Sequence, residues 1–156
     1  MSKSVKRVEA ALLAAGQPVR TIEMSAETRT ADLAAAAAQC AVDQIAKSII
    51  FQAAGSGEIV LFITAGGNRV DKQKASTVVG QPLGKADAEA IRSTTGFAIG
   101  GVAPVGHLTP IRAWFDPRLL EFPEIWAAAG APRHIFPIEP NALLAISGAT
   151  LADFTE

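Results

Sequence analysis

The chain has 156 residues, 49% of them hydrophobic, which suits one globular domain able to bury a core without metal or disulfide support. Its 14 basic and 15 acidic residues give a net charge of −1. This excludes the broad basic surface by which many nucleic-acid-binding domains are recognised. The single Cys40 excludes an internal disulfide and a thiolate metal cage.

The N-terminal residues predict a protein that is not exported. Met1 to Ser4 lead directly into charged residues, without the apolar segment of a secretory signal. No run approaches the roughly 18 uninterrupted apolar residues of a membrane span. We therefore expect a soluble, cytoplasmic protein with no membrane partner. The two distant histidines leave little for a metal site, and we expect no metal and no cofactor.

The first half of the chain alternates helix and strand patterns. Within residues 4–15, Val5, Val8, Leu12 and Ala15 share one helical stripe, which predicts a helix. The alanine-rich stretch that follows has high helix propensity. The elements predicted up to residue 80 are a helix at 4–15, an extended piece at 19–24, a helix at 31–40, strands at 45–53 and 58–64, and a helix at 71–79.

The second half continues the alternation around a glycine-rich loop. Asp87 and Glu89 lie near the start of a predicted helix, where the helix dipole favours acidic residues. The predicted elements are a helix at 86–95, a strand at 111–115, a helical turn at 117–120, extended segments at 124–129 and 133–138, a helix at 141–146, and a strand at 150–154. The pattern indicates a single mixed α/β domain, with no internal repeat or linker.

The loop at residues 94–107 is the most unusual segment. It holds four of the 13 glycines, and no charged residue lies between Arg92 and Arg112. Its Phe, Ile, Val and Pro residues predict a loop that packs inward while parts of its backbone stay exposed. Glycine-rich bends can direct backbone N–H groups at an anion or a developing oxyanion. A buried bend between two strands is the alternative interpretation.

Lys47 is the most informative single residue. In the predicted strand at 45–53, alternation places it on one face with Ile45, Ile49 and Phe51. A lysine on an apolar face is costly unless its ammonium finds a partner or reaches water. It either extends to solvent or places a cation at a pocket, directed at a phosphate, a carboxylate or a polarised carbonyl.

Several segments together resemble the YbaK/ProX-type aminoacyl-tRNA deacylases. Ala46-Lys47-Ser48 is followed by a strand pair and by Asn68-Arg69-Val70-Asp71. Residues 95–106 are similar to the family signature TGxxxGGxxPxG. Residues 129–134 resemble a late glycine turn of the family, and 140–144 its closing helix. The resemblance covers about residues 5–154.

The resemblance implies one editing domain over residues 1–156, with a mixed central β-sheet that is partly barrel-like and flanked by helices. It implies hydrolysis, in trans, of the ester that joins a wrong amino acid to the terminal adenosine of a tRNA. Members are similar to the editing domain of bacterial prolyl-tRNA synthetases. The implied partners are the acceptor end of a mischarged tRNA and, for some members, an aminoacyl-tRNA synthetase.

The resemblance also implies functional residues. Those expected to carry the reaction are Lys47, Gly100 and Gly101. Those expected to bind substrate are Thr95, Gly96, Phe97, Val102, Ala103, Pro104, Gly130 and His134. Those expected to contact tRNA are Arg69, Lys72, Lys74 and Arg133. His134 falls where members vary, so a general base, a substrate contact and a plain surface residue all stay open.

The implied reaction needs few catalytic groups. An aminoacyl ester is already activated, so positioning and oxyanion stabilisation can suffice for attack by water or by a substrate group. We expect the Gly100 and Gly101 N–H groups to hold the ester carbonyl while Lys47 orients the terminal ribose or its phosphate. Asp116 and Glu121 have no carboxylate partner at catalytic spacing and are expected to be solvated or capping. Two alternatives remain: a binding module without activity, and a hydrolase of small esters.

Overall fold

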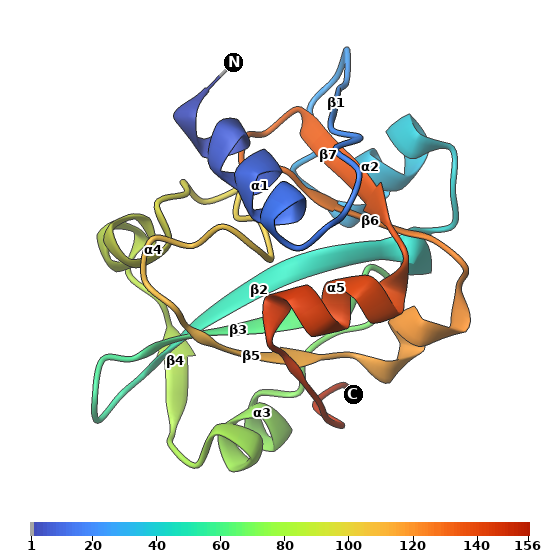
Figure 1. Cartoon of the computed structure of the whole chain (residues 1–156). Coiled ribbons are helices and arrows are strands. Elements are labelled where there is room, and N and C mark those ends of the chain that lie inside the picture. The colour runs from blue at the N-terminus through green and yellow to red at the C-terminus, as the bar shows by residue number, and fades with distance from the viewer. Residues whose placement is uncertain (1) are drawn as a thin grey trace.

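The computed structural model describes residues 2–156, which form eight strands with helices around them (Figure 1). The helices are α1 (Lys3–Ala14), α2 (Ala31–Ala38), η1 (Val42–Gln44), α3 (Lys72–Val79), α4 (Ala88–Thr95), η2 (Pro117–Glu121) and α5 (Pro140–Ser147). The strands are β1 (Ile22–Glu23), β2 (Ile45–Ala53), β3 (Ile59–Ala65), β4 (Leu83–Lys85), β5 (Arg112–Phe115), β6 (Ile125–Ala128), β7 (His134–Ile138) and β8 (Thr150–Leu151).

All strands belong to one mixed sheet. Its order is β1-β7-β6-β2-β3-β5-β8, and β4 pairs with β2 off this path. β2 and β3 form an antiparallel hairpin, while β6 joins β2 and β5 joins β3 in parallel. The path ends at β1 on one side and β8 on the other, so the sheet is open. The predicted mixed sheet flanked by helices is confirmed, without barrel closure.

The central strand β3 is buried on both faces. Leu61 and Ile63 belong to the larger core cluster, to which α1, α4 and α5 contribute apolar side chains. Val60 and Phe62 point to the opposite face and pack in a second cluster that includes residues of α3. Figure 1 shows α1 and α5 on one side of the long strand β2 and α3 on the other. Two helical layers therefore hold β2 and β3 in place.

The predicted elements are mostly confirmed because their ends carry side-chain signals. The strand at 45–53 has the predicted bounds. Thr30, Asp71 and Asp87 each accept a hydrogen bond from a backbone N–H of the helix that follows. The helix predicted at 31–40 ends at Ala38 because Gln39 adopts a left-handed conformation (φ 56°).

Three predictions differ from the structure. The extended piece at 19–24 contributes only two paired residues to β1, and the strand at 150–154 contributes two to β8. The strand β4 was not predicted. Leu83-Gly84-Lys85 is too short to show alternation, and pairing with β2 across the fold makes it a strand.

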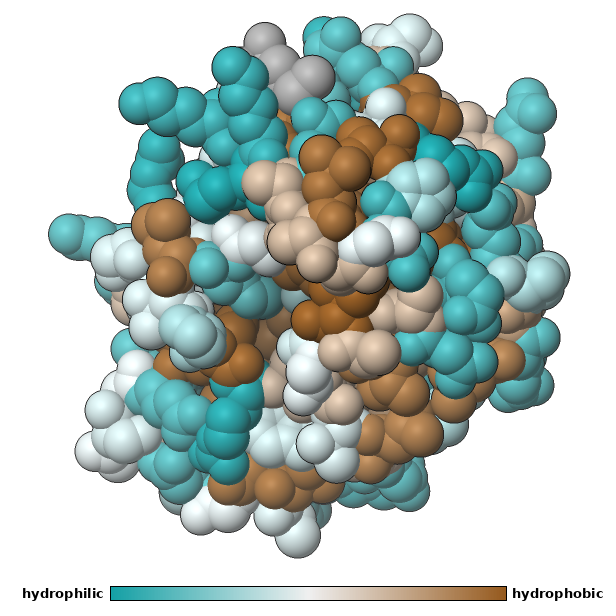
Figure 2. All heavy atoms as spheres, in the orientation of Figure 1, coloured by the Kyte–Doolittle hydropathy of each residue, from teal (hydrophilic) through white to brown (hydrophobic). Residues whose placement is uncertain are grey.

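Apolar residues gather at the centre of the face shown in Figure 2, over the region of α1 and α5, with polar residues around them. Leu13 at the end of α1 is exposed, and Leu144 and Ile146 of α5 are only partly buried. No helix within residues 2–156 has the length and apolar character needed to cross a bilayer.

Candidate functional site

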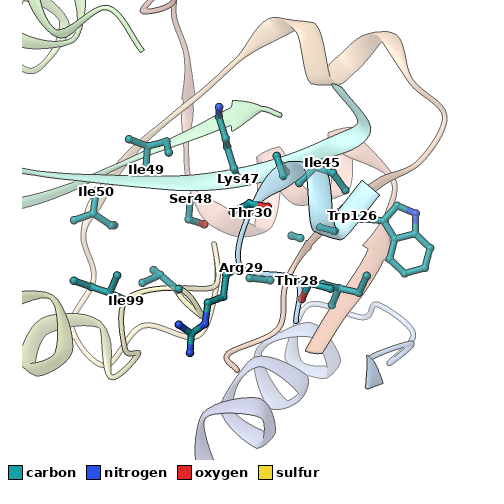
Figure 3. A pocket seen from close by; sticks show the side chains of 18 of the residues that line it. Thr28, Arg29, Thr30, Ile45, Lys47, Ser48, Ile49, Ile50, Ile99 and Trp126 are labelled. Carbon is teal, nitrogen blue, oxygen red and sulfur yellow. The ribbon is translucent and has the colours of Figure 1, made fainter. Parts of the chain in front are cut away.

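A cavity of about 550 Å³ lies where the sheet lacks a strand. One edge of β2 pairs with β6 at Ile45 and Ala46 and with β4 from Phe51 to Ala53. Between these pairings, no strand formed by residues 2–156 lies against this edge at residues 47–50. The lining comes from β2, β6 and β7, from the Thr28–Thr30 loop and α2, from the end of β4, from α4, and from the glycine loop (Figure 3).

The walls of this cavity are mostly apolar. They include Ile50 of β2, Ile91 of α4, Ile99 and Val102 of the glycine loop, and Trp126 of β6. The polar and charged side chains on its border are few: Thr28, Arg29, Thr30, Lys47, Ser48 and Lys85. Apolar walls with a few polar groups, at this volume, are typical of a site for a small molecule or one end of a larger one.

Lys47 borders the cavity from one side of β2. Figure 3 shows its side chain and that of Ile49 pointing to one side of the strand, and Ser48 and Ile50 pointing to the other. The Lys47 Nζ donates a hydrogen bond to the Gly66 carbonyl (3.1 Å). Burial lowers the pKa of this ammonium, and the Arg69 guanidinium lowers it further. An ammonium has three N–H donors, so this bond leaves capacity for a ligand.

The turn that holds the Lys47 ammonium is fixed by Asp116. This carboxylate is 3% exposed and accepts hydrogen bonds from the Ala65 N–H (3.1 Å), the Asn68 side-chain amide (2.8 Å) and the Arg118 N–H (3.0 Å). It caps η2, as expected for a capping residue. Of the two expected roles, solvated or capping, the structure shows the capping one, and three donors converge on the carboxylate in the core. The same donors fix the end of β3 just before Gly66.

Asp43 supports the other side of this turn. Its carboxylate accepts from the Gly67 N–H (2.8 Å) and from the Arg118 Nε (3.1 Å). Arg118 therefore joins Asp43 to the η2 turn that Asp116 caps. Lys47, Asp43 and Asp116 come from three separate segments, and this network fixes the position of the carbonyl that holds the ammonium.

The glycine loop forms the cavity wall on the Ser48 side of β2. Phe97, Ala103 and Val105 are buried, as predicted, whereas Ile99 is 59% exposed at the cavity border. Gly100 has φ +90°, a conformation that side chains rarely adopt. Its backbone lies beside the Arg29 side chain, whose Cδ would lie 3.4 Å from an added Cβ.

Gly101 packs the loop against the late glycine turn, where an added Cβ would lie 3.2 Å from the Ala131 Cα. Its N–H donates to the Ala98 carbonyl (3.0 Å) inside the loop. The expectation that both glycine N–H groups face the substrate is therefore wrong for Gly101. The Gly100 N–H is the remaining candidate of the pair.

Helix α1 holds both ends of the glycine loop. Arg7 donates from Nη2 to the Gly96 carbonyl (2.9 Å) and from Nε to the Gly106 carbonyl (3.2 Å). Its guanidinium lies over the Phe97 ring, 4.9 Å from the centroid. His107 donates from Nε2 to the Ala103 carbonyl (2.8 Å), and burial lowers the pKa of this imidazole. These contacts make the loop a fixed wall.

Lys47, Gly100 and Val102 are the predicted site residues that border the cavity. Thr95 is buried, donates to the Ile91 carbonyl (2.7 Å) and accepts from the Phe97 N–H (3.1 Å), which is helix-end bonding. The predicted residues that lie outside the cavity lining are Gly101, Thr95, Gly96, Phe97, Ala103, Pro104, Gly130, His134, Arg69, Lys72, Lys74 and Arg133.

His134 lies in a separate hollow with Ser25, Glu27 and Arg133. Its Nε2 is 3.7 Å from the Glu23 carboxylate. Its Nδ1 is buried and has no hydrogen-bond partner among residues 2–156. The structure therefore separates His134 from the cavity that Lys47 and Gly100 share.

The four basic residues expected to contact tRNA are exposed, and two have acidic partners. Lys74 pairs with Asp153 (3.2 Å), and Arg133 lies 3.5 Å from the Glu23 carboxylate. Arg29 and Lys85 are the exposed cations that border the cavity, and neither was among the residues predicted from the sequence. Arg29 precedes the Thr30 cap of α2, and no periodic pattern marked it as a site residue.

The two tryptophans lie in different environments. Trp114 packs in the core, stacked on Phe62 with ring centroids 5.3 Å apart. Trp126 is half-buried and borders the cavity. Burial raises the pKa of the Cys40 thiol, and the Glu124 carboxylate raises it further, so this thiol is poorly suited to act as a nucleophile. Within residues 2–156, no three His, Cys, Asp or Glu side chains are grouped as metal ligands would be.

Comparison with known proteins identifies similar structures and the family to which the chain belongs. The chain superposes with a TM-score of 0.92 on a crystal structure of "a putative trans-editing enzyme for prolyl tRNA synthetase", at 47% identity over 100% of this chain and 99% of that one. It superposes with a TM-score of 0.87 on hypothetical protein APE2540, at 27% identity over 96% and 99% of the two chains.

A curated relative is uncharacterized protein YwhH of Bacillus subtilis (strain 168). It is 26% identical over 121 residues, which are 78% of this chain and 76% of that protein. The sequence profile of the aminoacyl-tRNA editing domain matches residues 25–146, which include the whole cavity lining. The chain belongs to the aminoacyl-tRNA editing domain family.

Proposed function

We propose that this chain is an aminoacyl-tRNA deacylase, which hydrolyses the ester of a mischarged tRNA in trans and so corrects errors in translation. The family and the similarity to a trans-editing protein support hydrolysis at this level. The observation that carries the proposal is the cavity at the open edge of β2, bordered by Lys47 on one side and Gly100 on the other.

The reaction needs positioning more than a strong nucleophile. A water oxygen attacks the ester carbonyl carbon, the bond to the ribose oxygen breaks, and that oxygen takes a proton, which leaves a free amino acid and an intact tRNA end. The Lys47 ammonium orients the terminal ribose or its phosphate. The Gly100 N–H donates to the ester carbonyl oxygen, where negative charge develops during the attack. A side-chain thiol of the substrate can attack in place of water: its sulfur then bonds to the carbonyl carbon as the ribose oxygen leaves with a proton, and the cyclic thioester formed is opened by water to the free amino acid.

The partner is the acceptor end of a mischarged tRNA, met in the cytoplasm. A protein with net charge −1 that contacts only this end binds tRNA weakly. An aminoacyl-tRNA synthetase would supply additional affinity. Lys72, Lys74, Arg69 and Arg133 remain candidates for contacts farther from the cavity, and Arg29 is added at its border.

A panel of mischarged tRNAs tests the proposal. Turnover of at least one aminoacyl-tRNA supports editing. Binding of the tRNA end without turnover indicates a binding module, and turnover of free amino-acid esters alone indicates a small-ester hydrolase. Either of the last two results refutes the proposed function.

Replacement of Arg29 by glutamine is expected to raise KM for mischarged tRNA with little change in kcat. Arg29 lies beside Gly100 at the cavity border, where a guanidinium can contact the last phosphate of the tRNA. Loss of one single-strand phosphate contact lowers the slope of log binding constant against log salt by about 0.7. Titrations at several salt concentrations measure that slope.

Arg20→Gln is the matched control for this prediction. Arg29 is exposed and lies 3.6 Å from the Glu27 carboxylate. Arg20 is likewise an exposed arginine with a glutamate partner, Glu124 at 3.2 Å, but it lies outside the cavity lining. Its KM and salt slope are expected to equal those of the unmodified protein. Equal salt slopes for Arg29→Gln and Arg20→Gln contradict a phosphate contact by Arg29.

Replacement of Gly100 by alanine is expected to lower kcat about tenfold or more and to destabilise the fold by about 1 kcal/mol. A side chain at φ +90° strains the backbone by roughly 1–2 kcal/mol, and relief of that strain rotates the N–H away from the cavity. Gly80→Ala is the control, because Gly80 has φ +86° at the end of α3, outside the cavity. Comparable stability losses with equal kcat in both variants contradict a role for the Gly100 N–H.

A further inference from the structure

The open edge of β2 offers main-chain groups to the cavity. Ser48 pairs with Ile63 of β3, and the Ile63 carbonyl accepts from the Asp116 N–H on the side away from β2. In an antiparallel pair, residues alternate between those that bond the partner strand and those that face away from it. Ile63 therefore faces away from β2, and Ser48 likewise faces away from β3.

The hydrogen bond at the end of the β2–β3 hairpin shows the same alternation of residues that bond β3 and residues that face away from it. The Ala53 N–H donates to the Glu58 carbonyl on the β3 side. Counting back in steps of two, Ile49 and Lys47 also direct their main-chain groups toward β3, whereas Ser48 and Ile50 direct theirs toward the open edge. Two independent hydrogen bonds thus place the N–H and the C=O of Ser48 on the edge that no strand covers.

The gap leaves room for only a short extended ligand, and Ser48 offers its side chain there as well as its main chain. The pairing with β6 stops at Ala46 and the pairing with β4 begins at Phe51, so the gap spans residues 47–50. At about 3.3 Å per residue, such a gap is roughly 13 Å long. The Ser48 Oγ is also buried without a hydrogen-bond partner among residues 2–156. Unpaired polar groups at a cavity are typical of a site completed by a ligand.

We infer that the aminoacyl group of the substrate completes the sheet at Ser48, as a strand one residue long. In an antiparallel ladder, two facing residues exchange two N–H···O bonds. An aminoacyl ester carries the same two groups on either side of its Cα. Its α-ammonium donates to the Ser48 C=O, and its ester carbonyl accepts from the Ser48 N–H. This inference rests on the proposed function and deepens it.

The pairing also supplies a donor that the glycine loop lacks. The Gly101 N–H is already bonded within the loop, which leaves the Gly100 N–H to face the ester carbonyl alone. A second N–H from Ser48 gives the carbonyl oxygen two donors, as efficient oxyanion sites have. The cavity, bordered by both Ser48 and Gly100, is where such a carbonyl would lie.

The pairing further decides where the amino-acid side chain goes. Facing residues of an antiparallel pair direct their side chains to the same face of the sheet. The substrate side chain then lies on the Ser48 face, beside Ile50 and Ile99, and away from the Lys47 ammonium (Figure 3). This placement of the substrate side chain applies to an L-amino acid. A D-amino acid in the same pairing would direct its side chain to the Lys47 face. Selection among amino acids therefore belongs to Ser48, Ile50 and Ile99.

Amide hydrogen exchange of the intact protein, followed by NMR, tests the inference. The probe is an L-alanyl group joined by a stable amide to 3′-amino-3′-deoxyadenosine. In the free protein the Ser48 amide exchanges fast, while the Lys47 and Ile49 amides, bonded to β3, exchange slowly. With the probe bound, exchange at Ser48 is expected to slow at least tenfold, with Lys47 and Ile49 unchanged.

A second probe, with L-lactyl in place of L-alanyl, lacks the ammonium. It is expected to bind roughly tenfold or more weakly, because hydrogen bonds to charged groups contribute about 1.5–3 kcal/mol. Two results would overturn the inference. The first is unchanged amide exchange at Ser48 although the alanyl probe shifts the NMR signals of the Ile99 and Gly100 amides, which shows that it is bound. The second is equal affinity for the alanyl and lactyl probes.

Failure of the inference and failure of the proposed function are distinguishable. Turnover of a mischarged tRNA without protection of Ser48 refutes the main-chain pairing and leaves the deacylase proposal standing. Protection of Ser48 without turnover of any mischarged tRNA supports aminoacyl binding at the edge and refutes the deacylase. An absence of probe binding refutes the pairing.

Discussion

Replacement of Lys47 by methionine is expected to lower the rate of deacylation at least about 100-fold, the loss typical when a positioned charge at a reacting group is removed. Methionine keeps most of the apolar stem that borders the cavity and removes only the ammonium. The free energy of unfolding is expected to stay equal or rise, because folding places this charge in a partly buried site that lowers its pKa. Single-turnover deacylation and urea denaturation measure the two effects.

Lys6→Met is the matched control. Lys6 is an exposed lysine of α1, outside the cavity lining, so its removal is expected to change neither rate nor stability. Full activity of Lys47→Met would remove Lys47 from the mechanism. A large stability loss in Lys47→Met, with the remaining folded protein fully active, would assign Lys47 a structural role.

The pH dependence of stability follows from the lowered pKa of Lys47. The folded pKa lies below that of an exposed lysine, about 10.4. Between the two values the unfolded chain binds more protons, so stability rises with pH across that window. Below it the folded state carries the full cost of the buried charge, and Lys47→Met removes that cost. The stability difference between the two proteins is therefore expected to shrink as pH rises toward 10.4.

Replacement of Asp116 by alanine is expected to destabilise the fold by about 3 kcal/mol or more. The carboxylate is buried and accepts from the Ala65 N–H, the Asn68 amide and the Arg118 N–H. Each buried donor left without an acceptor costs about 1–3 kcal/mol. Urea denaturation measures the change, and Asp116→Asn, which keeps one acceptor oxygen, is expected to fall between alanine and the unmodified protein.

Asp153→Ala provides the comparison for Asp116→Ala. Asp153 is an exposed carboxylate whose partner is Lys74 at 3.2 Å, and exposed pairs contribute about 0–1 kcal/mol. In the folded fraction of Asp116→Ala, the turn at Gly66 keeps only its Asp43 support, so deacylation is expected to fall as well. Equal stability losses in Asp116→Ala and Asp153→Ala would contradict the role of Asp116 in the core.

Local patterns were sufficient to predict most elements of this fold. Alternation of apolar residues predicted β2 with its observed bounds, and Asp87 marked the start of α4. These signals work because the interactions that fix a helix end or a strand face lie within a few residues of one another. The short strand β4 had no such signal, and its pairing partner is about thirty residues away along the chain.

The features of the candidate site likewise fall into those that local sequence patterns predict and those that depend on the pairing of distant segments. Residue type and spacing alone were sufficient to predict that Lys47 lies on a strand, and that most apolar side chains of a glycine-rich loop pack inward. The pairing of distant segments was needed to show that β6 and β4 leave the edge of β2 open, that Arg29 borders the resulting cavity, and that His134 does not. The physical reason is that a cavity depends on which distant segments pair, and on where that pairing stops.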